Sequence, residues 1–323
     1  MGRGIFVRET GGPEVLRLED YDPGEPGAGQ VRVRLGAAGV NYIDTYFRKG
    51  AYPRPLPFVV GLEGAGRVEA LGAGVAGLSV GDRVAWPSVG GSYADFALAP
   101  ADRVVRVPDS VSDDAAAAAM MQGMTAHYLA HSTHATQPGD RALVHAAAGG
   151  TGLLLVQILK AAGAWVVGTC SSEEKRQLAL EAGCDHVIRY SDEDFVAEVE
   201  RLTEGRKLDV VYDSVGQTTF EGSLCCLRPR GLLVLFGMAS GPVPPFDLAR
   251  LNALGSLFVT RPSLAHYLQT RDELDLRAGE VLGAVESGRL KLRIGARFSL
   301  EEAADAHRAL EGRATTGKVI LQP

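Results

Sequence analysis

The chain has 323 residues, enough for two domains, and its 46% hydrophobic and 22% charged residues are typical of a globular protein. Its formal net charge is −6, from 33 Lys and Arg against 39 Asp and Glu, without a basic block. This balance argues against a protein whose main work is binding nucleic acid. No apolar run is long enough to span a membrane and no secretory signal is visible, so we expect no membrane contact and predict a cytoplasmic location.

The first 110 residues are rich in short β-type runs separated by glycine and proline. These runs lie at 4–7, 30–35, 66–71, 82–86, 93–98 and 103–107. Many short strands at this spacing predict a barrel-like or folded-sheet domain.

The character of the sequence changes near residue 112. Residues 112–131 open with a serine and two acids and continue as a helix pattern. From residue 141 onward, strand and helix patterns alternate for about 130 residues, which predicts an α/β fold with a doubly wound parallel sheet. A last apolar run at 256–260 extends that sheet as an edge strand.

The remaining residues resume the pattern of the first 110. They contain a helix near 263–287, a β-type stretch at 290–298, a helix at 301–311 and a terminal strand. We therefore predict a discontinuous catalytic domain, residues 1–121 and 262–323, with a dinucleotide-binding domain at 122–261 inserted into it.

Residues 145–152, HAAAGGTG, nearly match the glycine fingerprint of a dinucleotide-binding turn. The first fingerprint glycine is replaced by Ala147, while Gly149 and Gly152 occupy the two positions where a pyrophosphate and a helix approach the backbone. A strand pattern before the turn and a helix pattern after it favour dinucleotide binding over a plain glycine-rich turn.

The end of the second strand in this region indicates which dinucleotide is bound. Proteins that bind NAD place an acid there, but this chain has Thr169 to Ser172, followed by Lys175 and Arg176. Hydroxyl groups and cations suit a 2′-phosphate, so NADPH is favoured over NADH. The alternative is a serine that caps a helix with solvated charges.

The α/β insert occurs together with GVNYIDTYFRKGAYP at 39–53 and VVGLEGAGRVEALGAGV at 59–75. This combination resembles the medium-chain dehydrogenase/reductase superfamily and, within it, the quinone oxidoreductase (zeta-crystallin) branch. The resemblance runs from GGPEVL near the start to SLFVTRPSL and GRATTGKVIL near the end. It implies a Rossmann domain inserted in a GroES-like, mainly β catalytic domain, and a homodimer paired through the edge strand at 256–260.

Zinc alcohol dehydrogenases of this superfamily have a cysteine and a histidine where this chain has Asn41 and Leu62. Neither side chain replaces thiolate or imidazole at zinc, so we predict no metal and zinc-independent chemistry. Three histidines at helical spacing, 127, 131 and 134, are interpreted as a polar helix face, and Glu63 as a structural acid that binds backbone.

The resemblance assigns residues to a substrate site and a cofactor site. Catalytic roles fall on Asn41, Tyr46, Tyr52 and Gln122, whose amide and phenol groups suit hydrogen bonding to a quinone oxygen. The cofactor set is Asn41, Thr125, Ala148, Gly149, Gly150, Thr151, Gly152, Ser171, Lys175, Tyr190, Phe236, Gly237, Phe258, Val259 and Arg313. The alternative for each tyrosine is a half-buried aromatic with a satisfied hydroxyl, and for Arg313 an exposed cation at a helix end.

These patterns predict an NADPH-dependent quinone oxidoreductase that works in an interdomain cleft without zinc. The acceptor is a small quinone or an activated alkene, and the residues do not separate quinone reduction from reduction of enone or enoyl double bonds. A catalytically weak, crystallin-like protein that binds NADPH or RNA is the alternative from a different class.

Overall fold

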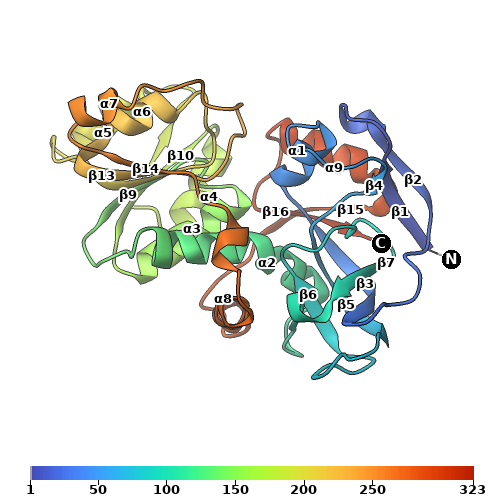
Figure 1. Ribbon diagram of the computed structural model, residues 1–323. Helices are drawn as coiled ribbons and strands as arrows, with labels where there is room; N and C mark the ends of the chain where they lie inside the picture. The colour runs from blue at the N-terminus through green and yellow to red at the C-terminus, as the bar shows by residue number, and fades with distance from the viewer. Residues whose placement is uncertain (1) are drawn as a thin grey trace. The chain divides into compact units, whose positions relative to one another are not determined.

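The computed structural model describes residues 2–323, which divide into two units (Figure 1). The first unit comprises Met1–Met124 and Tyr267–Pro323, and the second comprises Thr125–His266. The boundaries expected from the sequence fall slightly before these, after residues 121 and 261. The order along the chain is thus one unit interrupted by another.

The first unit contains two sheets. The larger sheet has the order β15-β16-β3-β5-β6-β8, with β7 paired to β3, and the smaller has the order β2-β1-β4. The strands are β1 (Gly2–Val7), β2 (Leu16–Tyr21), β3 (Gln30–Val40), β4 (Phe58–Val59), β5 (Glu63–Leu71), β6 (Arg83–Trp86), β7 (Phe96–Pro100), β8 (Val105–Arg106), β15 (Ile294–Ser299) and β16 (Lys318–Gln322).

Alternation along β3 explains how the larger sheet covers its core. Val31, Val33 and Leu35 are buried, while Arg32 and Arg34 between them point away and stack on the ring of Phe96. The last strand, β16, pairs antiparallel with the end of β3. The C-terminal segment therefore lies in the same sheet as residues near the start of the chain.

The helices of the first unit are short except for two. They are α1 (Tyr42–Arg48), α8 (Arg271–Glu286), α9 (Ala303–Glu311) and single turns at Pro13–Val15, Ala101–Arg103 and Leu300–Glu302, while α2 (Asp113–Tyr128) begins here and ends in the second unit. The expected helix at 263–287 is in fact two pieces, a turn at Leu264–Tyr267 and α8. The cause is Thr270, which caps α8 in a reciprocal capping box with Glu273.

The second unit is built on a six-stranded parallel sheet with the order β11-β10-β9-β12-β13-β14. Its strands are β9 (Arg141–Val144), β10 (Trp165–Cys170), β11 (His186–Arg189), β12 (Leu208–Asp213), β13 (Leu227–Leu235) and β14 (Phe258–Thr260). This order reverses between β9 and β12, so that the carboxyl ends of these two strands flank a topological switch point, where open α/β sheets bind ligands. The predicted Rossmann fold is confirmed.

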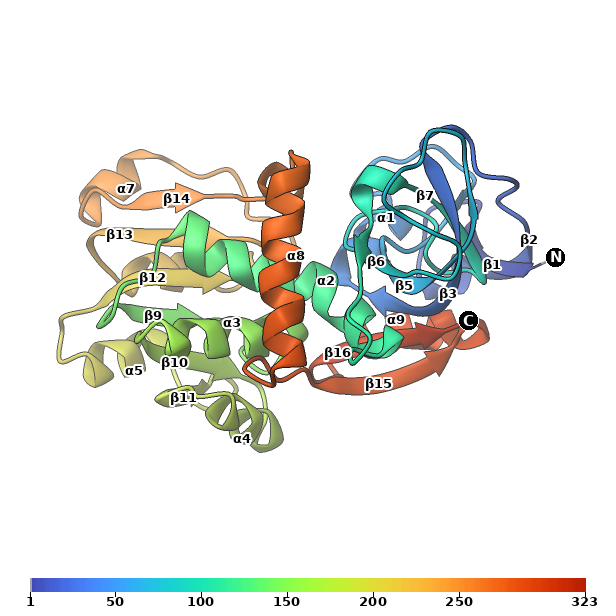
Figure 2. The same ribbon diagram turned by 90° about the horizontal axis from the view of Figure 1, so that it is seen from below.

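Helices cover both faces of the parallel sheet (Figures 1 and 2). They are α3 (Gly150–Ala161), α4 (Glu173–Glu181), α5 (Phe195–Leu202), α6 (Phe220–Cys225) and α7 (Ala249–Ala253), after a π-helical turn at Leu129–Thr133. Residues of α5, α6 and α7 pack into one apolar cluster with the sheet, and α3 packs with α4. Buried on both faces, the central strands are nearly continuous apolar runs. No helix within residues 2–323 has the length and apolar character needed to cross a membrane.

Candidate active site

The turn between β9 and α3 has the form of a phosphate cradle. Gly149 is the N-cap of α3 and offers no side chain, so the first N–H groups of the helix, at residues 150–152, are left for a ligand. Ala146 adopts a left-handed conformation with φ of 52°, which turns the chain from strand to helix. The predicted residues Ala148 to Gly152 therefore lie together at the positive end of the α3 dipole.

Two small residues permit this close packing. A Cβ at Gly152 would lie 2.8 Å from the carbonyl oxygen of Ala147 and closer still to that of Ala146, and both are backbone atoms. Ala147 is fully buried, and its N–H donates to the carbonyl of Thr169 in β10. Alanine thus serves at the first fingerprint position because its methyl group packs against the neighbouring strand.

The residues expected to meet a 2′-phosphate lie at the ends of β10 and β11. Ser172 caps α4 by accepting the N–H of Lys175, so the capping interpretation holds for Ser172, whereas Ser171 precedes the cap. The N–H of Tyr190 donates to the carbonyl of Cys170, which places this 41% exposed tyrosine beside Ser171. Glu173 points to Arg189 at 3.4 Å, away from the hydroxyl groups.

Asp213 organises the other side of the switch point. Its fully buried carboxylate accepts the N–H groups of Val215 and Gly216 at 2.8 and 3.0 Å, which fixes the turn after β12. Its carbonyl accepts the N–H groups of Phe236 and Gly237. The two residues predicted to line the nicotinamide are therefore held at the carboxyl end of β13, level with the phosphate turn.

A buried polar chain links the strands below this edge. Ser223 donates to Asp213 at 2.9 Å, so its oxygen accepts from Nε2 of His145, whose Nδ1 then accepts from Thr169 at 3.0 Å. Burial lowers the pKa of His145, which keeps the imidazole neutral and suits this tautomer. The chain fixes β9, β10, β12 and α6 relative to one another and was not predicted from the sequence.

The remaining cofactor candidates of the second unit differ in exposure. Phe258 and Val259, 61% and 38% exposed, lie in β14, which is shorter than the predicted strand at 256–260 because it pairs only with residues 232–234 of β13. Thr125 is half-buried on α2.

Asn41 lies in a buried polar cluster of the first unit. Its Nδ2 donates to Glu63 at 2.8 Å and to the carbonyl of Gly39, and its Oδ1 accepts from Lys318 at 2.9 Å and from Gln122 at 3.3 Å. Every hydrogen-bonding position of the amide is thus occupied within the protein. A direct bond from Asn41 to an acceptor would displace one of these partners, so its catalytic role stays a prediction.

Glu63 and Lys318 form the charged centre of this cluster. Both side chains are almost completely buried and they form an ion pair, and Glu63 also accepts the backbone N–H of Met121 in α2. The expected backbone-binding role of Glu63 is therefore seen, whereas Lys318 was not anticipated. Gln122 donates to Asn41, but its Oε1 has no partner among the described residues although the atom is buried.

Tyr46 and Tyr52 lie against each other. Their ring centroids are 5.4 Å apart in an edge-to-face arrangement, and Phe47 packs edge-on to Tyr52 at 5.8 Å. The N–H of Tyr52 donates to the carbonyl of Tyr46, which ties the loop after α1 back to the helix. Both tyrosines are half-buried. The structure thus brings together the two phenols to which the resemblance assigns the substrate.

Asp44 connects Asn41 to a second buried chain. One carboxylate oxygen accepts the N–H of Asn41 and the hydroxyl of Tyr93, and the other, also buried, has no partner among residues 2–323. Tyr93 in turn accepts from His307, and Arg48 donates to the opposite ring nitrogen. Burial raises the pKa of Asp44 to about 7 and lowers that of His307 to about 3.

Arg313 lies in the first unit, two residues beyond the end of α9. It has a left-handed backbone with φ of 58° and an exposed side chain. Its predicted contact with a cofactor stays a prediction.

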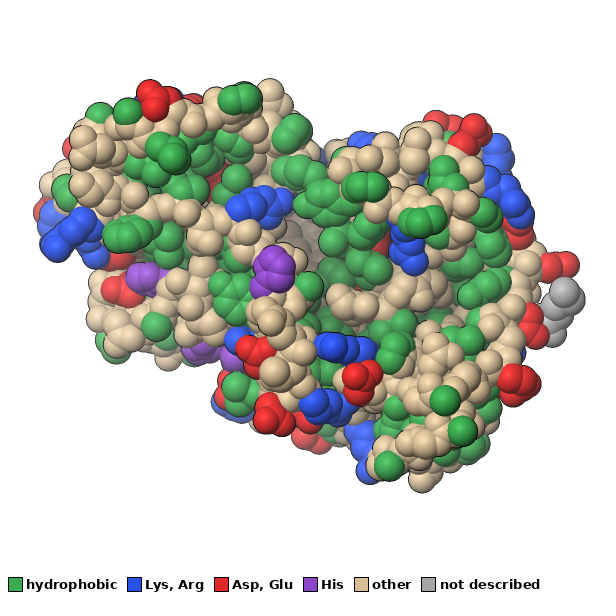
Figure 3. Space-filling view, in the orientation of Figure 1, with side chains coloured by type: hydrophobic (Ala, Val, Ile, Leu, Met, Phe, Trp, Pro, Cys, Tyr) green, Lys and Arg blue, Asp and Glu red, His purple; other side chains and the backbone are tan. Residues whose placement is uncertain are grey.

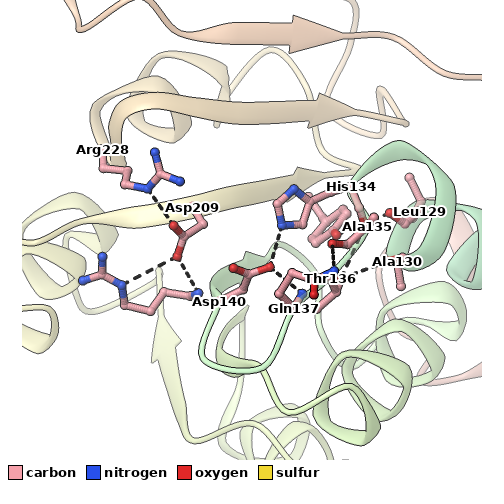
Figure 4. A network of polar contacts seen from close by, with 11 residues as sticks. Leu129, Ala130, His134, Ala135, Thr136, Gln137, Asp140, Asp209 and Arg228 are labelled. Atoms are coloured by element: carbon pink, nitrogen blue, oxygen red, sulfur yellow. Dashed lines mark hydrogen bonds and ion pairs between the residues drawn. The ribbon is translucent and has the colours of Figure 1, made fainter.

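The three histidines at helical spacing have structural partners. The rings of His127 and His131 lie 4.6 Å apart, and His134 binds Asp140 at 2.9 Å, where Asp140 also accepts the N–H of Gln137 (Figure 4). This network closes the turn before β9, at the end of the sheet opposite the phosphate turn. Within residues 2–323, no three His, Cys, Asp or Glu side chains converge as metal ligands would.

Four important residues were missed by sequence reasoning: Asp44, Asp213, His145 and Lys318. Asp44 gives a local signal, because it stands three residues after Asn41 in a capping pattern. Asp213 gives a weaker one, as an acid that ends an apolar strand. His145 and Lys318 gain their roles only from partners far away in the sequence.

Comparison with known proteins agrees with this geometry. Residues 27–109 match the family described as alcohol dehydrogenase GroES-like domain, and residues 150–272 match the zinc-binding dehydrogenase family. A quinone oxidoreductase of Pseudomonas aeruginosa is 47% identical to the chain, and both sequences are covered completely. This chain belongs to the quinone oxidoreductase family of the medium-chain dehydrogenases/reductases.

Other relatives show the range of the family. A 2-haloacrylate reductase of Burkholderia is 44% identical, with 98% of each chain covered. The crystal structure of Escherichia coli quinone oxidoreductase complexed with NADPH is 42% identical and superimposes with a TM-score of 0.98 over the full length of both chains.

Proposed function

We propose that this protein is an NADPH-dependent quinone oxidoreductase. The observation that carries the proposal is the phosphate turn at the switch point of the parallel sheet, in a chain of the quinone oxidoreductase family. The reaction converts NADPH, a proton and a quinone into NADP⁺ and a hydroquinone. NADPH supplies the hydride when it is bound, and the protein supplies binding, orientation and hydrogen bonds.

The residues at the carboxyl ends of the strands fit this cofactor. A Cβ at position 149 or 152 would come close to backbone carbonyl oxygens, and glycine avoids this contact at both positions. The N–H groups at the start of α3 suit a pyrophosphate. Ser171 and Lys175 offer a hydroxyl and a cation for the 2′-phosphate, with Tyr190 beside them. Phe236 and Gly237 are in position to hold the nicotinamide side.

The half-buried phenols of Tyr46 and Tyr52 are the groups that we assign to the acceptor. A phenol donates a hydrogen bond to a quinone oxygen, and this bond strengthens as negative charge develops on that oxygen during hydride transfer. Asn41 and Gln122 complete the assigned set, and Lys318 and Glu63 hold the amide of Asn41 in one orientation. The position of the acceptor between the domains stays a prediction.

A second activity is favoured by a specific relative. The Burkholderia relative is named for reduction of 2-haloacrylate, an activated alkene. Hydride addition to a carbon conjugated with a carbonyl group needs the same stabilisation of a developing negative oxygen as quinone reduction does. We therefore include α,β-unsaturated carbonyl compounds among the acceptors.

We further propose that the protein is a homodimer paired through β14. This strand ends the parallel sheet, and its described neighbour is β13 alone. It contains neither lysine nor proline, and Phe258 and Val259 are exposed, as is Leu248 just before α7. An unprotected apolar edge is usually paired or covered.

The test is an initial-rate comparison of NADPH and NADH with 1,2-quinones, 1,4-quinones and enones. We expect turnover with quinones and a kcat/KM at least about tenfold higher for NADPH than for NADH, since a paired 2′-phosphate contributes one to two charge-assisted hydrogen bonds. A preference for NADH would contradict the role of Ser171 and Lys175. Tight NADPH binding without any turnover would favour the binding-protein alternative instead. On the face seen in Figure 3, cationic and anionic side chains are interspersed, without the basic stripe of an RNA-binding surface.

A further inference from the structure

Arg54 lies in the loop between α1 and β4, two residues after Tyr52. Its side chain is half-buried. Among the arginines of residues 2–323 that are buried or half-buried, it alone has neither a hydrogen bond nor an ion pair within the protein. Arg48 six residues earlier, by contrast, is completely buried and binds Glu311 with two hydrogen bonds.

Aromatic rings and a glycine hold the guanidinium of Arg54 in place. Its Cζ lies 4.8 Å from the ring centroid of Phe58 and 5.8 Å from that of Phe47. One Nη atom lies so close to Gly90 that a Cβ there would be 2.5 Å away. The Phe58 and Phe47 rings pack against the guanidinium, and no described residue accepts from its N–H groups, so these donors are left for an acceptor.

This guanidinium belongs to the same aromatic cluster as the proposed substrate tyrosines. Phe47, on which Arg54 stacks, packs edge-on to Tyr52, and Tyr52 packs edge-on to Tyr46. All of these residues belong to α1 or to the loop that follows it. A molecule that binds to the phenols of this loop therefore has a cation nearby.

The site lacks a counter-charge of its own. Desolvation lowers the pKa of Arg54, and attraction to Asp44 opposes that effect without an ion pair between the two. Asp44 directs its bonded oxygen to Asn41 and Tyr93 and makes no contact with Arg54. A half-buried cation with unused donors is costly unless an anion pairs with it. The planar fork of a guanidinium matches a carboxylate better than any other common anion except phosphate.

We propose that Arg54 binds a carboxylate on the electron acceptor, so that the preferred substrates are quinones or unsaturated carbonyl compounds that carry an acidic group. This inference rests on the proposed function, because it assumes that the acceptor binds at Tyr46 and Tyr52. It adds the substrate class: the phenols bind the oxygen that is reduced, and Arg54 selects acceptors by their charge.

The test compares a naphthoquinone carboxylate with its methyl ester as acceptors at saturating NADPH. For Arg54→Met, we expect kcat/KM to fall at least about tenfold with the carboxylate and to change less than about twofold with the ester. Arg54→Lys keeps the charge without the planar fork. Its kcat/KM with the carboxylate should therefore lie between the values of the unaltered protein and of Arg54→Met. Gly90→Ala, which displaces the guanidinium and leaves the charge unaltered, should lower only the carboxylate rate. Arg17→Met, at an exposed arginine of β2, serves as the matched control.

Equal losses with both acceptors, or no loss with either, would overturn the proposal. A binding measurement keeps this result separate from the proposed function. Calorimetric titration with naphthoate, which cannot be reduced by hydride transfer, should give at least about tenfold weaker binding to Arg54→Met than to the unaltered protein. Absence of NADPH turnover would contradict the proposed function, whereas equal naphthoate affinities would contradict the role of Arg54.

Discussion

Asp44 has an unusual environment for an acid. One of its oxygens accepts two hydrogen bonds, and the other is buried with no partner in the described part of the chain. Burial dominates, so that the pKa of Asp44 rises from an ordinary 3.8 to about 7. His307, two hydrogen bonds away through Tyr93, is buried as the neutral imidazole, with a pKa lowered from 6.5 to about 3.

Asp44→Asn should change how stability depends on pH. Folded Asp44 keeps a proton that the unfolded chain loses between about pH 4 and 7, so its contribution to stability is present at low pH and declines as pH rises. Replacement by Asn removes this decline. The free energy of unfolding of the variant, minus that of the unaltered protein, should increase by roughly 1 kcal/mol per pH unit across this range. Chemical denaturation of the intact chain at several pH values measures it.

His307→Gln is the matched control with the opposite sign. Neutral His307 makes the folded protein lose stability as pH falls from about 6.5 towards 3, because only the unfolded chain then binds the proton. The free energy of unfolding of His307→Gln, minus that of the unaltered protein, should therefore increase as pH falls. A difference for Asp44→Asn that stays flat with pH would show that Asp44 is ionised in the folded protein throughout.

The role of a residue can be predicted from the sequence more readily when its partners lie close to it in the chain. The α3 turn joins residues within one short segment, and its glycine motif located it, whereas the Ser172 cap was only the alternative interpretation of its segment. Lys318 binds Asn41 across 277 residues, and only the pairing of β16 with β3 brings them together. A lysine that begins an apolar terminal strand gives no signal of that partner.

Among the elements, the junction of β9 and α3 is the most sharply constrained. Gly152 packs where any side chain would meet two backbone carbonyl groups, whereas a Cβ at Gly149 would lie 3.1 Å from one carbonyl oxygen only. Neither glycine has a positive φ, so the requirement at residue 152 is space and not conformation.

Gly152→Ala should therefore weaken NADPH binding. The added methyl group must push α3 away from the turn, because backbone cannot move aside as a flexible side chain does, and overpacking of this kind costs about 1 to 3 kcal/mol. We expect the Kd for NADPH, measured by fluorescence titration, to rise at least about tenfold. Gly279→Ala, in α8, where an added Cβ meets nothing within 4 Å, is the control and should leave the Kd unchanged. An unchanged Kd for Gly152→Ala would show that the helix does not bind the phosphates.

Element boundaries were predicted less well than element types. The edge strand at 256–260 is shortened to Phe258–Thr260 because its register is fixed by β13, which pairs only these three residues. The helix expected from residue 263 begins at Arg271 instead, since the capping box at Thr270 outweighs the apolar pattern before it. Boundaries depend on caps and partners, which a hydrophobic pattern does not contain.

At the scale of the whole molecule, we expect two copies joined through β14. Light scattering at micromolar concentration should give the mass of a dimer. Phe258→Lys places a charge on the exposed edge and should shift the protein towards monomer. Leu276→Lys, at a similarly exposed leucine of α8, is the control and should leave the dimer intact. A monomer for the unaltered protein would contradict the pairing.

The division of the chain was readable from the sequence because the two units use different hydrophobic periods. Strand runs dominate residues 1–110, whereas strand and helix patterns alternate across residues 141–260. The pattern of the C-terminal segment indicated that it belongs with the first 110 residues, but neither the pairing of β16 with β3 nor the buried ion pair of Glu63 and Lys318 was predicted. The cytoplasmic location stays a prediction.

The most direct test of the account is a single-turnover experiment with NADPH and a neutral 1,4-quinone under anaerobic conditions, with the protein in excess. We predict loss of one NADPH for each quinone, at a rate far above that of the reagents alone and above that with NADH. NADPH that stays bound and unoxidised in the presence of quinone would contradict it.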